Sequence, residues 1–210
     1  MLELLIVPTG MLEENCYIIY EPMHKVAFLV DPGDEGERLS EIIEDKGIQP
    51  KMIINTHGHF DHIGAISYLK ERYKIPFLIH QGDLGLLKDG NLGFGLAPSL
   101  DKVQEVEQVL VGDEILDFLG YEIQVIATPG HTQGGVCLYI PKMKWLFTGD
   151  TLFKGTIGRT DLKGGNYTEL ILSINERLKD IPDDTIIFPG HGESSTMGQE
   201  RAYNQYFDID

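Results

Sequence analysis

The 210-residue sequence has few cysteines, few basic residues and no long apolar run. Its two cysteines, Cys16 and Cys137, lie in apolar segments without metal-ligand spacing, which predicts buried free thiols rather than a disulfide or a cysteine-zinc site. No apolar stretch approaches the about 20 residues that span a bilayer, and the N-terminus lacks the basic start of a signal peptide. We therefore expect a cytoplasmic protein that does not associate with membranes.

Basic residues are outnumbered by acidic ones, 17 to 33, which gives a formal net charge of −16. A surface of this sign repels nucleic-acid phosphates, so we expect no nucleic-acid partner. The contents of 42% hydrophobic and 24% charged residues are typical of globular proteins. No linker, low-complexity run or sequence repeat divides the chain, which predicts one domain over residues 1–210.

Hydrophobic periodicity predicts two halves, each with strands followed by helices. Strands are expected at 2–7, 15–20, 26–31, 52–55, 77–80, 106–111, 114–118, 121–127, 135–140, 144–148 and 185–188. Helices are expected at 35–46, 62–73, 81–88, 167–179 and 197–205. Two sheets, each covered by helices on one side, predict an α/β protein built as a four-layer αββα sandwich.

One segment breaks every period. Residues 89–101 contain Gly90, Gly93, Gly95 and Pro98. The segment is interpreted either as an ordinary surface loop or as a lid over a site, because long irregular loops often close over ligands.

The densest chemistry lies in Thr56-His57-Gly58-His59-Phe60-Asp61-His62. Three imidazoles and one carboxylate fall within six residues, from His57 to His62, directly after a predicted strand. Imidazole and carboxylate are ligands of zinc, iron and manganese. A polar turn could merely hydrogen-bond its histidines, but this spacing favours a metal site.

Three more candidate ligands follow other predicted strands. His131 and His191 each follow a Pro-Gly turn, and Asp150 follows Thr148-Gly149. Together with the His-rich loop they make seven candidate ligands, too many for one tetrahedral ion and suited to two. A first ion would take His57, His59 and His131. A second ion would take Asp61, His62 and His191, and Asp150 would bridge the two.

This ligand set resembles that of the metallo-β-lactamase superfamily, and the resemblance covers the whole chain. Lactam-cleaving members often have cysteine where this chain has Asp150. The segments around Asp31, at 158–161 and at 189–201 are most similar to short bacterial glyoxalase II-like (hydroxyacylglutathione hydrolase-like) proteins. The resemblance implies the fold of that superfamily and two divalent metal ions, with zinc as the first choice and iron or manganese as alternatives.

The resemblance also implies a reaction. We expect hydrolysis of a small anionic thioester, S-D-lactoylglutathione or a similar acyl thioester, by a hydroxide that bridges the two ions, with Asp61 orienting it and taking its proton. The alternatives are a persulfide dioxygenase with one iron, and a lactonase or esterase. Full-length glyoxalase II has a C-terminal helical domain for glutathione, and this chain has only 19 residues after His191, so we expect glutathione recognition to differ.

Three further residues are candidates for supporting roles. Asp31 could accept a hydrogen bond from a ligand imidazole, or it could simply cap its turn. Arg159 could bind a substrate carboxylate, or it could pair with Asp161 and shape the loop. Lys154 is a weaker candidate for the same anion, which needs local positive charge beside so acidic a surface.

Overall fold

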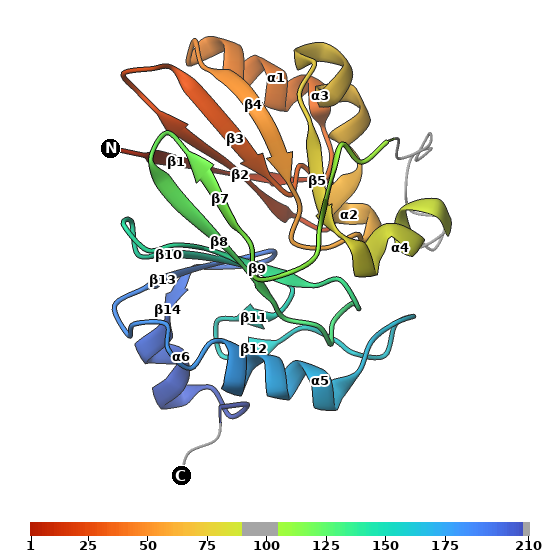
Figure 1. Ribbon diagram of the computed structural model, residues 1–210, viewed down its shortest axis with the longest axis vertical. Coiled ribbons are helices and arrows are strands. Elements are labelled where there is room, and N and C mark those ends of the chain that lie inside the picture. Colours follow the sequence, from red (N-terminus) through yellow and green to blue (C-terminus); the bar gives the residue numbers. More distant parts are fainter. Residues whose placement is uncertain (90–104, 208–210) are drawn as a thin grey trace. The chain divides into compact units, whose positions relative to one another are not determined.

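The computed structural model describes residues 1–89 and 105–207, which fall into two compact units (Figure 1). Unit 1 comprises Met1–Ile79 and Leu84–Val109, and unit 2 comprises His80–Asp83 and Leu110–Asp210. The single domain expected over residues 1–210 stays a prediction. Among the helices described, none is long and apolar enough to cross a membrane.

Unit 1 is built on a mixed sheet with the strand order β1-β2-β3-β4-β5-β6. Its strands are β1 (Glu3–Thr9), β2 (Glu14–Glu21), β3 (Val26–Val30), β4 (Gln49–Ile54), β5 (Phe77–His80) and β6 (Gln108–Leu110). The strands β1, β2 and β3 pair antiparallel, whereas β3, β4 and β5 pair parallel. Parallel neighbours end at the same edge of a sheet, so the residues after β3 and after β4 are brought together.

The helices of unit 1 are α1 (Gly36–Asp45), α2 (Phe60–Ile63), α3 (Ile66–Tyr73) and α4 (Leu84–Asp89). Leu39 and Ile43 of α1 and Ile66 and Leu69 of α3 are buried in one core with apolar side chains of the sheet, including Phe77. This amphipathic spacing explains why α1 and α3 cover the sheet rather than stand in solvent.

The single helix expected over 62–73 is wrong at one point, because α2 and α3 are separated by Gly64 and Ala65. The turn after β3 packs against this junction. The backbone N–H of Ala65 donates to the carbonyl of Pro32 at 3.0 Å, and a Cβ on Gly64 would lie 2.3 Å from the Gly33 carbonyl oxygen. A close backbone contact across about 30 residues of sequence is invisible to local periodicity.

Unit 2 has a second mixed sheet, with the order β14-β13-β10-β9-β8-β7. Its strands are β7 (Ile115–Phe118), β8 (Tyr121–Ala127), β9 (Val136–Ile140), β10 (Trp145–Gly149), β13 (Ile186–Pro189) and β14 (Ser195–Thr196). Strand β9 is antiparallel to both β8 and β10, and β13 is parallel to β10. Strands β8, β10 and β13 therefore run in one direction and end at one edge.

The remaining elements of unit 2 are the hairpin β11 (Leu152–Phe153) and β12 (Thr156–Ile157), α5 (Tyr167–Leu172), the π-helical turn η2 (Ser173–Arg177) and α6 (Met197–Tyr203). The helix expected over 167–179 is thus α-helical only over its first part. Leu170, Ile174 and Leu178 bury the expected apolar face in the core of unit 2. Cys16 and Cys137 are free and buried, as predicted.

Candidate metal centre

The His-rich loop follows β4 and is closed by Asn55, a buried residue that the sequence did not single out. The Asn55 side chain donates to the carbonyl oxygen of His62 at 2.8 Å and to that of His57 at 3.4 Å. The backbone N–H of His62 donates to the carbonyl of His59 at 3.0 Å. These contacts fold His57, His59, Asp61 and His62 into one compact loop at the end of the strand.

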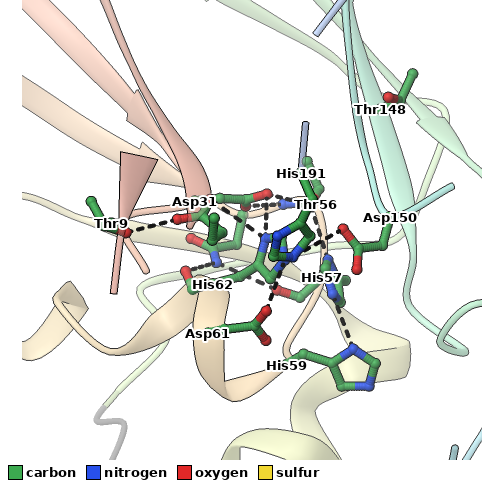
Figure 2. A network of polar contacts seen from close by, with 12 residues as sticks. Thr9, Asp31, Thr56, His57, His59, Asp61, His62, Thr148, Asp150 and His191 are labelled. Atoms are coloured by element: carbon green, nitrogen blue, oxygen red, sulfur yellow. Dashed lines mark hydrogen bonds and ion pairs between the residues drawn. The ribbon is translucent and has the colours of Figure 1, made fainter. Parts of the chain in front are cut away.

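Asp31 lies at the end of the neighbouring strand β3 and organises this loop (Figure 2). Its Oδ1 accepts the backbone N–H of Thr56 at 2.7 Å, and its Oδ2 accepts the Thr56 hydroxyl at 2.5 Å. The same Oδ2 lies 3.0 Å from Nδ1 of His62. A carboxylate only accepts, so His62 carries its proton on Nδ1 and presents an Nε2 lone pair.

The tautomer of His57 follows from the same network. Its Nδ1 lies 3.1 Å from the Thr56 oxygen, whose proton is already donated to Asp31. His57 is therefore the donor of this contact, and its Nε2 keeps a lone pair. Asp31 thus sets the tautomers of two imidazoles, one directly and one through a hydroxyl, which is the role that partners of metal-bound histidines have.

The donor atoms of unit 1 are spaced as metal ligands require. Two ligands of a tetrahedral zinc ion, each about 2.0–2.1 Å from it, lie about 3.3 Å apart. His57 Nε2 is 3.1 Å from His59 Nδ1, and His62 Nε2 is 3.8 Å from Asp61 Oδ2. Asp31, His57 and His62 also have ligand-type atoms within 4.8 Å of one another, but the hydrogen bonds of Asp31 already use its oxygens. Unit 1 therefore offers two pairs of candidate metal ligands, His57 with His59 and Asp61 with His62.

A second buried carboxyl group, Glu14, lies beside His62 and was not anticipated. Its Oε2 accepts the Thr9 hydroxyl at 3.0 Å, and its Oε1 lies 3.7 Å from His62 Nδ1. Burial raises the pKa of Glu14 well above its usual range, the His62 ring opposes this, and the nearby Asp31 adds to it. Glu14 is the first residue of β2, which also contains the polar residues Asn15 and Glu21, so no local sequence signal distinguishes it.

In unit 2, the three expected ligands follow the three strands that run in one direction: His131 after β8, Asp150 after β10 and His191 after β13. The two oxygens of Asp150 face different histidines. Oδ1 lies 3.8 Å from His191 Nε2 (Figure 2), and Oδ2 lies 3.4 Å from His131 Nε2. Both distances are close to the about 3.3 Å between two ligands of one tetrahedral ion, which is the spacing that the predicted bridging role of Asp150 requires.

The segment 158–161 fixes the tautomer of His131. The His131 Nδ1 lies 2.7 Å from the backbone carbonyl oxygen of Arg159. A carbonyl accepts only, so Nδ1 carries the proton and Nε2 presents a lone pair. Gly158 packs against the same ring and against the residue after β10, because a Cβ there would lie 3.1 Å from His131 Nδ1 and 1.8 Å from the Asp150 carbonyl oxygen.

The two cationic candidates are both engaged with carboxylates on exposed surface. Arg159 donates from Nε and Nη2 to the two oxygens of Asp161 at 2.7 and 2.9 Å. This pairing raises the pKa of Arg159 and lowers that of Asp161 to about 2. Lys154 pairs with Glu193 at 2.5 Å, which raises the pKa of the lysine.

Each unit thus gathers its own share of the predicted ligands. Unit 1 holds His57, His59, Asp61 and His62, and unit 2 holds His131, Asp150 and His191. Their union in one dinuclear centre stays a prediction. The proposed lid or surface loop at 89–101 lies, from residue 90 on, outside the described residues.

Comparisons with known proteins give one consistent family. The model of the metallo-beta-lactamase superfamily matches residues 9–191. The hydroxyacylglutathione hydrolase GloC of Haemophilus influenzae is 37% identical over 205 residues, which cover 96% of each chain.

Two solved structures are similar over nearly their full length. One is the BLEG-1 B3 metallo-beta-lactamase, with a TM-score of 0.91, 34% identity and coverage of 98% of this chain and 99% of that one. The other is TTHA1623 in a di-iron-bound form, with a TM-score of 0.85, 36% identity and coverage of 97% and 100%. The predicted α/β fold of the metallo-β-lactamase type is confirmed, and the chain belongs to the metallo-β-lactamase superfamily.

Proposed function

We propose that this metal-dependent hydrolase cleaves a small anionic thioester, S-D-lactoylglutathione or a similar acyl thioester, with two divalent metal ions. The observation that carries the two-ion centre is Asp150, whose oxygens lie 3.4 and 3.8 Å from nitrogens of two different histidines. The thioester is supported by GloC, a relative named as a hydroxyacylglutathione hydrolase.

In this proposal the two units together form one domain and one centre. The first ion would be held by His57, His59 and His131 and the second by Asp61, His62 and His191, and Asp150 would be shared. The donor set contains no cysteine, which suits zinc, iron or manganese, and TTHA1623 has a di-iron-bound form. When bound, such ions supply a Lewis acid for the carbonyl oxygen and lower the pKa of water.

The protein's own side chains then orient the reactants and move the proton. Asp61, whose side chain is 14% exposed, hydrogen-bonds the attacking water and accepts its proton at a carboxylate oxygen. The attack breaks the C–S bond, and a thiolate departs without needing an acid. Arg159 and Lys154 supply positive charge for the anionic part of the substrate, and Arg159 would exchange Asp161 for a substrate carboxylate.

Two alternatives remain within the same site. A persulfide dioxygenase would use a single iron and consume oxygen. A lactonase, esterase or lactamase would use the same two ions on another acyl group, and the BLEG-1 similarity gives the lactam a specific reason to be tested.

A substrate panel with metal quantified per chain tests the proposal. The panel contains S-D-lactoylglutathione, simple acyl thioesters, lactones, a β-lactam and glutathione persulfide with an oxygen electrode. We expect two metal ions per chain and the highest kcat/KM on a thioester. One iron per chain with oxygen uptake would contradict the proposal, as would turnover confined to the β-lactam.

Substitution of ligands links activity to the assigned residues. Asp61→Ala and His59→Ala are each expected to lower kcat/KM by more than the about 10- to 100-fold typical of residues behind the ligands, with the chain still folded. His24→Ala is the control, because it removes an imidazole that pairs with Glu21 in a surface turn. Full turnover of His59→Ala with unchanged metal content would refute the assignment.

A further inference from the structure

Asp83 is a buried carboxylate that the sequence did not single out and that the proposed chemistry does not use. It lies in the 3₁₀ turn Gln81–Asp83 directly after β5. Residues His80–Asp83 belong to unit 2, although the chain before and after them belongs to unit 1. Asp83 is 0% exposed, so its charge requires compensating hydrogen bonds.

Those hydrogen bonds come from the turn that carries His131. The Thr132 hydroxyl donates to Asp83 Oδ2 at 2.8 Å, and the backbone N–H of Gly134 donates to Asp83 Oδ1 at 2.7 Å. Both oxygens of the carboxylate therefore accept hydrogen bonds from the short segment that follows His131. Charge-assisted hydrogen bonds of this kind are about twice as strong as neutral ones.

The turn 81–83 and the turn 131–134 approach each other so closely that neither Gly82 nor Gly134 could carry a side chain. A Cβ on Gly82 would lie 2.6 Å from the carbonyl oxygen of Gln133, and a Cβ on Gly134 would lie 2.5 Å from the backbone nitrogen of Asp83. The two backbones thus pack directly against each other. The carboxylate of Asp83 is held against the turn by main-chain contact as well as by hydrogen bonds.

The other end of the same turn is fixed by Asn166, the N-cap residue of α5, and by η2. The carbonyl oxygen of Gly130 accepts the backbone N–H of Asn166 at 2.7 Å. The Ser173 hydroxyl donates to the carbonyl oxygen of Pro129 at 2.7 Å. The residues before His131 are thus held by Asn166 and Ser173, and the residues after it are held by Asp83.

We propose that Asp83 is a positioning residue, which holds the turn 131–134 so that His131 Nε2 stays in place beside Asp150 for the first metal ion. The inference rests on the proposed function, because it assumes that His131 and Asp150 share an ion. Without Asp83, the Thr132 and Gly134 donors lose their buried acceptor. The turn then rearranges toward solvent, and the imidazole loses its fixed distance of 3.4 Å from Asp150 Oδ2.

Asp83→Ala and Asp83→Asn give a graded test on the full chain. Asparagine keeps an oxygen for the Gly134 N–H, and the Thr132 hydroxyl can turn to accept from its amide, so the effect of Asp83→Asn is smaller. The affinity of one of the two zinc ions, measured by competition with a chelator, is expected to fall by about 10- to 100-fold in Asp83→Ala. The affinity of the other ion is expected to stay unchanged.

Thr132→Val removes one of the two hydrogen bonds and should give an intermediate loss. The double variant Asp83→Ala with Thr132→Val should be no worse than Asp83→Ala alone, because both changes break the same contact. Glu114→Gln is the matched control. Glu114 also uses both carboxylate oxygens on a turn of unit 2, accepting from the N–H groups of Val111 and Gly112 at 2.6 and 3.0 Å.

The outcomes are separable. If the wild type binds fewer than two ions, the proposed dinuclear function fails irrespective of Asp83. If the wild type binds two ions and Asp83→Ala loses melting temperature but keeps both affinities, Asp83 is merely structural and the inference is overturned. A selective loss of one ion in Asp83→Ala, absent in Glu114→Gln at a similar melting temperature, supports it.

Discussion

Replacing Asp31 with asparagine isolates the hydrogen-bond chemistry behind the His-rich loop. Asp31 has a positive φ of 48°, which asparagine tolerates better than most residues, so the backbone is retained. The amide oxygen can still accept the Thr56 N–H. The amide nitrogen, however, replaces the oxygen that accepts from the Thr56 hydroxyl and from His62 Nδ1. Two donors then face each other at His62.

The size of the effect follows from these contacts. The hydrogen bond from His62 to the charged carboxylate of Asp31, about 1.5–3 kcal/mol, is lost. The hydrogen bond from the backbone N–H of Thr56 becomes one to a neutral amide oxygen, about 0.5–1.5 kcal/mol. Removing a buried charge offsets part of this loss. About 2 kcal/mol of stability should disappear, which lowers the melting temperature of a chain of this size by about 4–8 °C.

The consequence for metal binding is larger. His62 escapes the donor–donor contact by moving its proton to Nε2, which removes the lone pair intended for the second ion. The affinity for that ion should fall by about 10- to 100-fold, measured by chelator competition alongside thermal unfolding. Asp113→Asn is the matched control, because Asp113 also has a positive φ, of 62°, but pairs with Arg177 on the surface. Wild-type affinity for both ions in Asp31→Asn would refute the reasoning.

Three further predictions concern other parts of the chain. Burial raises the pKa of Cys137 to about 11, so a thiol reagent at pH 8 should label neither cysteine of the native protein but both after unfolding. Between pH 9 and 11 the Cys137 thiol ionises only in the unfolded chain, so the free energy of unfolding should fall as pH rises through that window. Labelling of the native protein at pH 8 would contradict the burial of the thiols. Arg159→Ala should raise KM for an anionic thioester by about tenfold, or about 1.4 kcal/mol, at unchanged metal content, because the carbonyl that His131 uses is main chain; an unchanged KM would exclude a role in binding. Gly130→Ala should lower stability by about 1–3 kcal/mol in thermal unfolding, because φ is 135° and the new Cβ would meet the Leu170 backbone nitrogen at 2.2 Å; a stability equal to that of the wild type would be unexpected.

Local sequence patterns were sufficient to predict an element whose burial is visible within its own residues. Short apolar runs located the central strands β2, β3, β9 and β10, which are buried on both faces, and helical spacing located α1 and α3, because burial of one helix face leaves a period in the sequence. They failed where a distant backbone intervenes. The break at Gly64 depends on the turn at Pro32 and Gly33, and the two-residue strands β11, β12 and β14 are too short to have a period.

By itself, the sequence predicted which side chains carry the chemistry and determined that each follows a strand, since residue type and a Pro-Gly or Gly-Asp turn are local properties. Only the tertiary structure decided which nitrogen of His57, His62 and His131 is presented, because a tautomer is set by partners far away in the chain. It also revealed Glu14, Asn55 and Asp83. In the sequence these are ordinary polar residues, and their importance comes from being buried against the ligand loops.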